Sequence, residues 1–221
     1  RIWNLRQTNF PVLTKRGSEG AVMSLAFSPD SKVLAAGGVN GNIRIWNDLS
    51  TEDQGRNLTG HSGGVIALAF NPDNHRIASG SWDGTLRLWD LTNPVGGAVI
   101  LREQIEMMSA VAFSLDGKVL AAGSGDGSIQ RWEIHPAVSS LPPLLGHESR
   151  VMSLAFSTDG QLLASGDWDA TLRLWRLEKK TESKPSVSLI LRSHNSRILG
   201  LALSEDGQTL FSSSPDETML S

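Results

Sequence analysis

The sequence predicts an all-β protein built from one four-stranded antiparallel unit that is repeated along the chain. The first observation is the spacing of tryptophan, because five of the seven Trp residues recur at intervals of 43: Trp3, Trp46, Trp89, Trp132 and Trp175. The second observation is a run of apolar residues upstream of each of the last four of these tryptophans. The third is that turn-forming residues lie between each apolar run and its tryptophan. A fixed period of this length is typical of a repeated supersecondary unit.

The apolar run is expected to form the first strand of each unit. Its copies span 22–27, 65–70, 108–113 and 151–156, with a weaker copy at 198–203. Nearly every position in these runs is apolar, which is the pattern of a strand that is covered on both faces.

Two reversals and two further strands follow in each unit. Ser-Pro-Asp-Ser at 28–31 and Ser-Thr-Asp-Gly at 157–160 suit a tight type I turn. A short strand of small residues comes next, as at 77–80, and a second reversal at 82–85 leads into the Trp strand. The Trp strand alternates apolar and polar residues, for example over 85–89. Because the residues before the next apolar run leave room for an outer strand, the unit is a four-stranded meander.

Composition excludes several classes of protein. The 221 residues are 39% hydrophobic and 19% charged, which is typical of a globular soluble chain. The formal net charge of −3 argues against nucleic acid as the main partner, and no apolar run is long enough for a membrane helix. The absence of cysteine excludes disulfides and thiolate metal sites. We therefore expect a cytoplasmic protein with no cofactor, no metal, and neither nucleic acid nor membrane as partner.

Two repeats carry a Gly-His pair followed by a Trp-Asp pair or a variant of it: Gly60-His61 with Trp89-Asp90, and Gly146-His147 with Trp175-Arg176. On these motifs the chain resembles the WD40 repeat family, in particular the multi-repeat WD40 proteins of bacteria such as cyanobacteria. The resemblance covers 1–221 as a single array, which ends in an incomplete repeat at 194–221. It implies a β-propeller, in which four-stranded blades pack around a central channel.

Five repeats are visible, whereas members of the family typically close a ring with about seven blades. We therefore expect the chain to be a segment of a larger ring, and the alternative is a closed five-bladed ring. An open segment would expose the apolar flank of each terminal blade, which would favour self-association.

Serine, histidine and aspartate recur together in three repeats and raise the possibility of a hydrolase. The three sets, with the strand Trp where it is present, are His61, Ser79, Asp83 and Trp89; His147, Ser165, Asp169 and Trp175; and His194, Ser212 and Asp216. An enzyme needs one nucleophile in one cleft, so the repetition argues against catalysis. The resemblance implies a structural role instead, in which a buried hydrogen-bonded chain joins Trp, Ser, His and Asp.

The other two tryptophans, Trp82 and Trp168, each precede the Asp of the second turn. In an antiparallel meander this turn lies at the same end as the start of the first strand. Seven further residues are expected near that end: Met23, Ile66, Met107, Met152, Leu199, Arg150 and Arg197. The resemblance implies that these side chains project from one face of the ring and contact partners. Aromatic residues, Met and Arg are also the types that are enriched at protein interfaces.

These observations predict a non-enzymatic scaffold that presents a rigid propeller face to another protein. The resemblance leaves a second hypothesis open, in which the array is the sensor or ligand-recognition domain of a larger signalling NTPase or kinase. A hydrolase that uses one Ser-His-Asp set is the third and least supported hypothesis.

Overall fold

The computed structural model describes residues 14–15, 20–49, 54–93, 97–103, 105–135, 137–177 and 186–220, the last without the side chains of 186–188. Trp3 lies outside the described residues. The described residues form strands and turns, and they contain no helix that could span a membrane.

The strands form five antiparallel sheets, and in each sheet strands that are consecutive in the chain lie side by side. The first sheet contains β1 (Val22–Phe27), β2 (Leu34–Gly38), β3 (Ile43–Trp46) and β4 (Arg56–Leu58). The second contains β5 (Val65–Phe70), β6 (Arg76–Ser81), β7 (Thr85–Asp90) and β8 (Ala98–Glu103). The third contains β9 (Met108–Phe113), β10 (Val119–Ser124), β11 (Ile129–Glu133) and β12 (Ser139–Leu144).

The fourth sheet contains β13 (Val151–Phe156), β14 (Leu162–Asp167), β15 (Leu172–Arg176) and β16 (Ser186–Leu191). The fifth contains β17 (Gly200–Leu203), β18 (Leu210–Ser213) and β19 (Met219–Leu220). Each predicted apolar run is thus a first strand, and each described Trp of the 43-residue series lies on a third strand. The prediction of repeated four-stranded meanders is confirmed, with three described strands in the last sheet.

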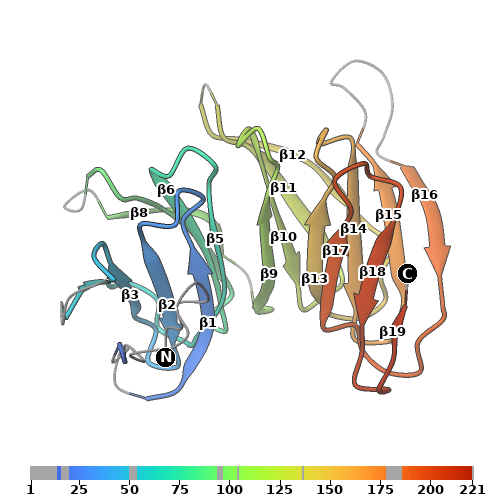
Figure 1. The fold of residues 1–221 in the computed structure, drawn as a ribbon, viewed down its shortest axis with the longest axis horizontal. Coiled ribbons are helices and arrows are strands. Elements are labelled where there is room, and N and C mark those ends of the chain that lie inside the picture. Colours follow the sequence, from blue (N-terminus) through green and yellow to red (C-terminus); the bar gives the residue numbers. More distant parts are fainter. Residues whose placement is uncertain are drawn as a thin grey trace, which may run out of the picture.

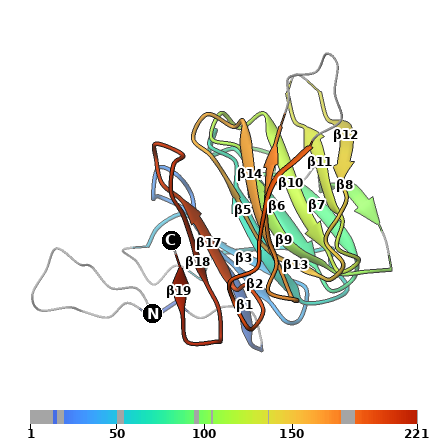
Figure 2. The ribbon, with the colours of Figure 1, turned by 90° about the vertical axis from the view of Figure 1, so that its right-hand side faces the viewer.

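The five sheets are blades that follow one another in an arc. Their first strands contact each other in chain order, β1 with β5, β5 with β9, β9 with β13 and β13 with β17. Figure 1 shows the sheets in this order, from the blue blade to the red one. Figure 2 shows the outer strands β8 and β12 at the right-hand margin, away from the inner strands.

Within the described part of the chain, the arc is not closed into a ring by packing of β1 against β17. The first blade therefore exposes Leu25 and Phe27, whereas the corresponding Leu68 and Phe70 of the second blade are half-buried and buried. The expectation of an open array with apolar flanks is confirmed, and the alternative of a closed five-bladed ring is wrong.

The first turn of each blade has the predicted chemistry. In the third blade the Gly117 N–H donates to the Ser114 carbonyl at 2.9 Å, and the Ser114 hydroxyl donates to the Asp116 carboxylate at 2.7 Å. Gly117 has a φ of +69°, a conformation that glycine adopts without steric cost. Ser31 and Asn74 occupy the same position with φ values of +60° and +62°.

The strand tryptophans fill the space between blades. Trp89 shares a buried core cluster with Ile43, Ile45 and Leu58 of the preceding blade. In the same way Trp132 packs in a cluster with Leu86 and Leu88, and Trp175 shares its cluster with Ile129 and Leu144. Each indole therefore stabilises two blades, because it belongs to one and covers the apolar face of the previous one.

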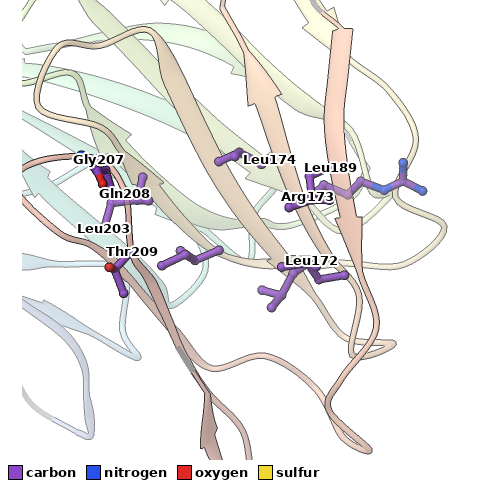
Figure 3. Close-up of a pocket in the computed structure, with 10 residues that line it drawn as sticks. Leu172, Arg173, Leu174, Leu189, Leu203, Gly207, Gln208 and Thr209 are labelled. Carbon is purple, nitrogen blue, oxygen red and sulfur yellow. The ribbon is translucent and has the colours of Figure 1, made fainter.

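A hollow lies at the corresponding place between the fourth and fifth blades (Figure 3). Its walls are Leu172, Leu174, Leu189 and Leu191 on one side and Leu203 and Leu210 on the other. The other three junctions are filled here by a strand tryptophan, and the described part of the fifth blade contributes none. The hollow thus has the composition of an interblade core.

Candidate interaction face and its supporting network

The second blade contains the complete hydrogen-bonded network of Trp, Ser, His and Asp. The His61 Nδ1 lies 2.9 Å from Asp83 Oδ2, and the His61 Nε2 lies 2.7 Å from the Ser79 Oγ. The Trp89 Nε1 donates to the same Ser79 Oγ at 2.8 Å. Strand β6 supplies the Ser, strand β7 supplies the Trp, and the loop before β5 supplies the His, so the chain ties three segments together.

Donor and acceptor chemistry fixes the direction of these bonds. An ionised carboxylate only accepts, so the His61 Nδ1 carries the proton and donates to Asp83. The His61 Nε2 then accepts from the Ser79 hydroxyl, whose oxygen accepts from the indole. Ser79 has an exposed fraction of 0%, so its hydroxyl is closed to any substrate. This geometry supports a structural role for the set and does not fit a nucleophile.

The environment shifts two pKa values in this network. Burial lowers the pKa of His61 below its ordinary value of 6.5, although the Asp83 carboxylate acts in the opposite direction. Burial acts to raise the pKa of Asp83, but hydrogen bonds from Thr85, Ser62 and His61 outweigh it and lower the pKa to about 2. At neutral pH the pair is therefore a neutral imidazole and an ionised carboxylate.

We expect the free energy of unfolding to fall as the pH falls below about 6.5, because unfolded His61 then binds a proton that the native state excludes. The free energy of unfolding should fall further as the pH falls from 3.8 towards about 2, because in this range Asp83 binds a proton in the unfolded chain but not in the native state. Urea unfolding at about pH 7.5 and about pH 5 tests the first step. The His61→Gln variant should lose less stability than the wild type between these values, and an equal loss would contradict the assignment.

The fourth blade corrects one prediction. His147 Nε2 lies 2.6 Å from the Ser165 Oγ, and the Trp175 indole donates to that oxygen at 2.7 Å, as expected. The acid, however, is Asp167, whose Oδ2 lies 2.7 Å from His147 Nδ1, and the expectation of Asp169 is wrong.

The reason is that Asp167 is the last residue of β14, where the second blade has Ser81. Its buried carboxylate reaches the imidazole and also accepts from the Thr171 and Asp169 N–H groups at 2.8 and 3.0 Å. Burial acts to raise the pKa of Asp167, but the bonds from His147 and Thr171 outweigh it and lower the pKa. One carboxylate thus takes the roles of both Ser81 and the turn aspartate, and Asp169 is exposed.

The fifth blade has the same arrangement up to the serine. His194 Nε2 lies 2.8 Å from the Ser212 Oγ, and His194 Nδ1 lies 3.0 Å from Asp216 Oδ2. The Thr218 hydroxyl donates to Asp216 at 2.6 Å, and this bond is the main reason that the pKa of Asp216 is lowered. In the first and third blades, buried Ala36 and Ala122 occupy the position of the serine.

The predicted face is at one end of the blades. Backbone bonds hold the residue before the turn Asp against the residue that precedes the first strand. The Trp82 N–H donates to the Gly64 carbonyl at 3.0 Å, the Gly125 N–H donates to Met107 at 2.9 Å, and the Trp168 N–H donates to Arg150 at 2.9 Å. Trp82 and Trp168 remain 44% and 41% exposed. The main chain of each tryptophan is therefore fixed, and its side chain remains partly exposed.

A β-bulge places three more of the predicted residues on this face. The strand register shifts between Val22 and Ser24, and in the same way around Ile66 and Met152, so that one residue has no partner on the neighbouring strand. The extra residues are Met23, Ile66 and Met152, which are exposed or half-buried. A bulge redirects a side chain out of the sheet, and it explains why apolar residues here are not buried.

Four of the predicted face residues form one continuous cluster across three blades. The Arg150 and Arg197 guanidinium groups lie over the Trp168 ring, with Cζ atoms 4.7 and 4.6 Å from its centroid. The Arg150 Nη1 also lies 2.8 Å from the Met107 sulfur. Leu199, the last predicted residue, is exposed beside β17. None of the nine predicted face residues is buried.

Sequence reasoning missed two contributors to the network. The Thr85 hydroxyl donates to Asp83 at 2.7 Å and lies 2.9 Å from His61 Nδ1. The signal for it was present, because Ser or Thr follows the second turn in each later repeat. Asp167 was also visible as an acid at a position where the second and third repeats have Ser81 and Ser124. The described residues contain no group of three His, Cys, Asp or Glu side chains that could hold a metal ion.

Successive four-stranded blades, joined by strand tryptophans and a Trp–Ser–His–Asp network, define a β-propeller of the WD40 type. A family model described as the IFT122 first beta-propeller matches residues 1–220. The chain therefore belongs to this β-propeller family. A comparison with curated proteins gives no match.

Proposed function

We propose that the protein is a non-enzymatic scaffold that binds another protein through the face defined by Trp82, Trp168 and the residues around them. The observation that carries the proposal is the pair of half-exposed indoles whose backbone is fixed at the second turn of two blades. A large aromatic group that is rigid and exposed loses little conformational entropy on binding.

Membership of the β-propeller family supports this proposal, because a propeller offers a rigid surface at one end of its blades. The bulge residues Met23, Ile66 and Met152 add adaptable apolar area at the same end. The Ser-His-Asp sets do not compete for the role of functional site, since the hydroxyls of Ser79 and Ser165 are buried and accept from an indole.

The test is a variant that carries Trp82→Ala and Trp168→Ala together. We expect its free energy of unfolding to stay within about 0.5 kcal/mol per site of that of the wild type, because substitutions of exposed residues cost little. When immobilised and exposed to an extract of the source cells, it should fail to retain proteins that the wild type retains.

Leu115→Ala is the matched control. Leu115 is an apolar residue, 59% exposed, in the turn between β9 and β10, at the opposite end of the blades. This variant should retain the same proteins as the wild type. Identical retained proteins in the double tryptophan variant would contradict the proposal, and so would a double variant that fails to fold.

A further inference from the structure

We propose that the cluster of Met107, Arg150, Trp168 and Arg197 binds the carboxylate of an acidic side chain in a peptide segment of the partner. The inference rests on the proposed function, because it concerns the same face, and it specifies the chemistry of the partner. Its basis is a pair of guanidinium groups that are held in place and that have no carboxylate partner among the described residues.

Stacking on one indole holds the two arginines. With both Cζ atoms less than 5 Å from the Trp168 centroid, the guanidinium planes are placed by cation–π contact. The main chain that carries this indole is also held, since the Trp168 backbone N–H donates to the Arg150 carbonyl and the Ile198 N–H donates to the neighbouring Asp167 carbonyl, both at 2.9 Å. Two half-buried cations from neighbouring blades are thereby preorganised on one surface.

Their hydrogen-bonding capacity is largely unused. In the described part of the chain, Arg150 donates only to the Met107 thioether, which is a weak acceptor, and Arg197 donates no side-chain bond. Neither has a carboxylate at ion-pair distance among the described residues. By contrast, Arg131 donates twice to the Pro142 carbonyl. Each guanidinium offers five N–H donors in a planar fork that matches a carboxylate.

A surface hollow adjoins the cluster, lined by Trp168, Asp169, His194, Asn195, Ser196 and Arg197. Asp169, which is exposed and whose expected place in the network is taken by Asp167, lines this hollow. Glu148 is a second exposed acid, two residues before Arg150. These charges oppose a dianionic phosphate more strongly than a monoanionic carboxylate. The apolar surface of Met107 and Leu199 next to the arginines favours apolar residues on either side of the acid.

In the experiment, peptides that bind the immobilised protein are selected from a random library displayed on phage. The wild type should enrich peptides with Asp or Glu at one fixed position beside apolar residues. The affinity of the best peptide should fall about tenfold to a hundredfold in the Arg150→Gln/Arg197→Gln variant, since bonds to charged groups are strong. Replacing the acidic residue of that peptide by its amide should lower the affinity for the wild type by the same factor, and should not lower the affinity for the double arginine variant any further.

Two single substitutions sharpen the test. Asp169→Asn removes a repelling charge from the hollow and should tighten binding of the selected peptide. Arg176→Gln removes an exposed guanidinium from β15, outside the cluster, and should leave the affinity unchanged. Thermal unfolding of each variant should match that of the wild type.

The outcomes separate this inference from the proposed function. Peptides that lack a fixed acid, or that bind the double arginine variant as well as the wild type, overturn the carboxylate site. If such peptides bind the Trp82→Ala/Trp168→Ala variant more weakly than the wild type, the proposed interaction face is supported and only the carboxylate site is overturned. Selected peptides that bind the tryptophan variant as tightly as the wild type would overturn both proposals, and so would a selection that enriches no peptide.

Discussion

Replacing Trp89 by alanine should lower the free energy of unfolding by about 3–5 kcal/mol, the range for deleting a large buried aromatic side chain. The indole is 4% exposed and packs against Ile43, Ile45 and Leu58 of the preceding blade. Its removal therefore leaves a cavity between two blades and takes the indole N–H from the Ser79 hydroxyl. Urea unfolding followed by far-ultraviolet circular dichroism measures the loss.

Trp89→Phe separates packing from hydrogen bonding. Phenylalanine keeps most of the apolar contact but cannot donate to Ser79, so we expect a smaller loss of about 1–3 kcal/mol. Repeated in a Ser79→Ala background, the same substitution should cost less, because the two residues act through one bond. A phenylalanine variant as stable as the wild type would show that the N–H contributes nothing.

Replacing Asp167 by alanine should lower the free energy of unfolding by about 1–3 kcal/mol, because the buried imidazole of His147 and the turn N–H groups lose their acceptor. Asp167 is 2% exposed, so water does not readily replace the carboxylate. Urea unfolding at neutral pH gives the comparison.

Asp169→Ala is the matched control, two residues away and exposed. Its effect should stay within about 0.5 kcal/mol. Equal losses for the two variants, or a larger loss for Asp169, would return the network role to the residue that the repeat pattern favours.

Much of the fold could be predicted from the sequence because each repeat contains the same pattern of apolar run, turns and tryptophan. The recurrence of Trp46, Trp89, Trp132 and Trp175 locates four third strands, and the apolar runs locate the first strands. The open arc depends on the number of blades, which the family resemblance supplied and local propensity does not contain.

The network could be predicted only where the repeats are strictly equivalent. In the second blade the expected residues, His61, Ser79, Asp83 and Trp89, lie together. In the fourth blade, alignment by position favoured Asp169, but the carboxylate that contacts the imidazole belongs to Asp167, at the end of the strand. Which of two nearby acidic residues contacts the imidazole depends on their positions in space, and spacing along the chain does not give these positions.

The residues of the face could be located from meander geometry, but their contacts could not. Trp82 and Trp168 were expected at the same end as Arg150 and Arg197, and the structure places them there. The contact of the Arg150 and Arg197 guanidinium groups with the single Trp168 ring is one between side chains, which spacing along the chain does not specify. The register shifts at the first strands were not predicted, because a bulge has no fixed sequence signal.

Those bulges have a consequence for how the surface can change during evolution. Met23, Ile66 and Met152 have no partner across the ladder, so their identity is not constrained by strand pairing. Exchange of these side chains would change the exposed chemistry at this end of the blades while the hydrogen-bonded frame beneath it is kept. The chemistry of this surface and the stability of the blades therefore depend on different residues, so the surface can vary while the fold is kept.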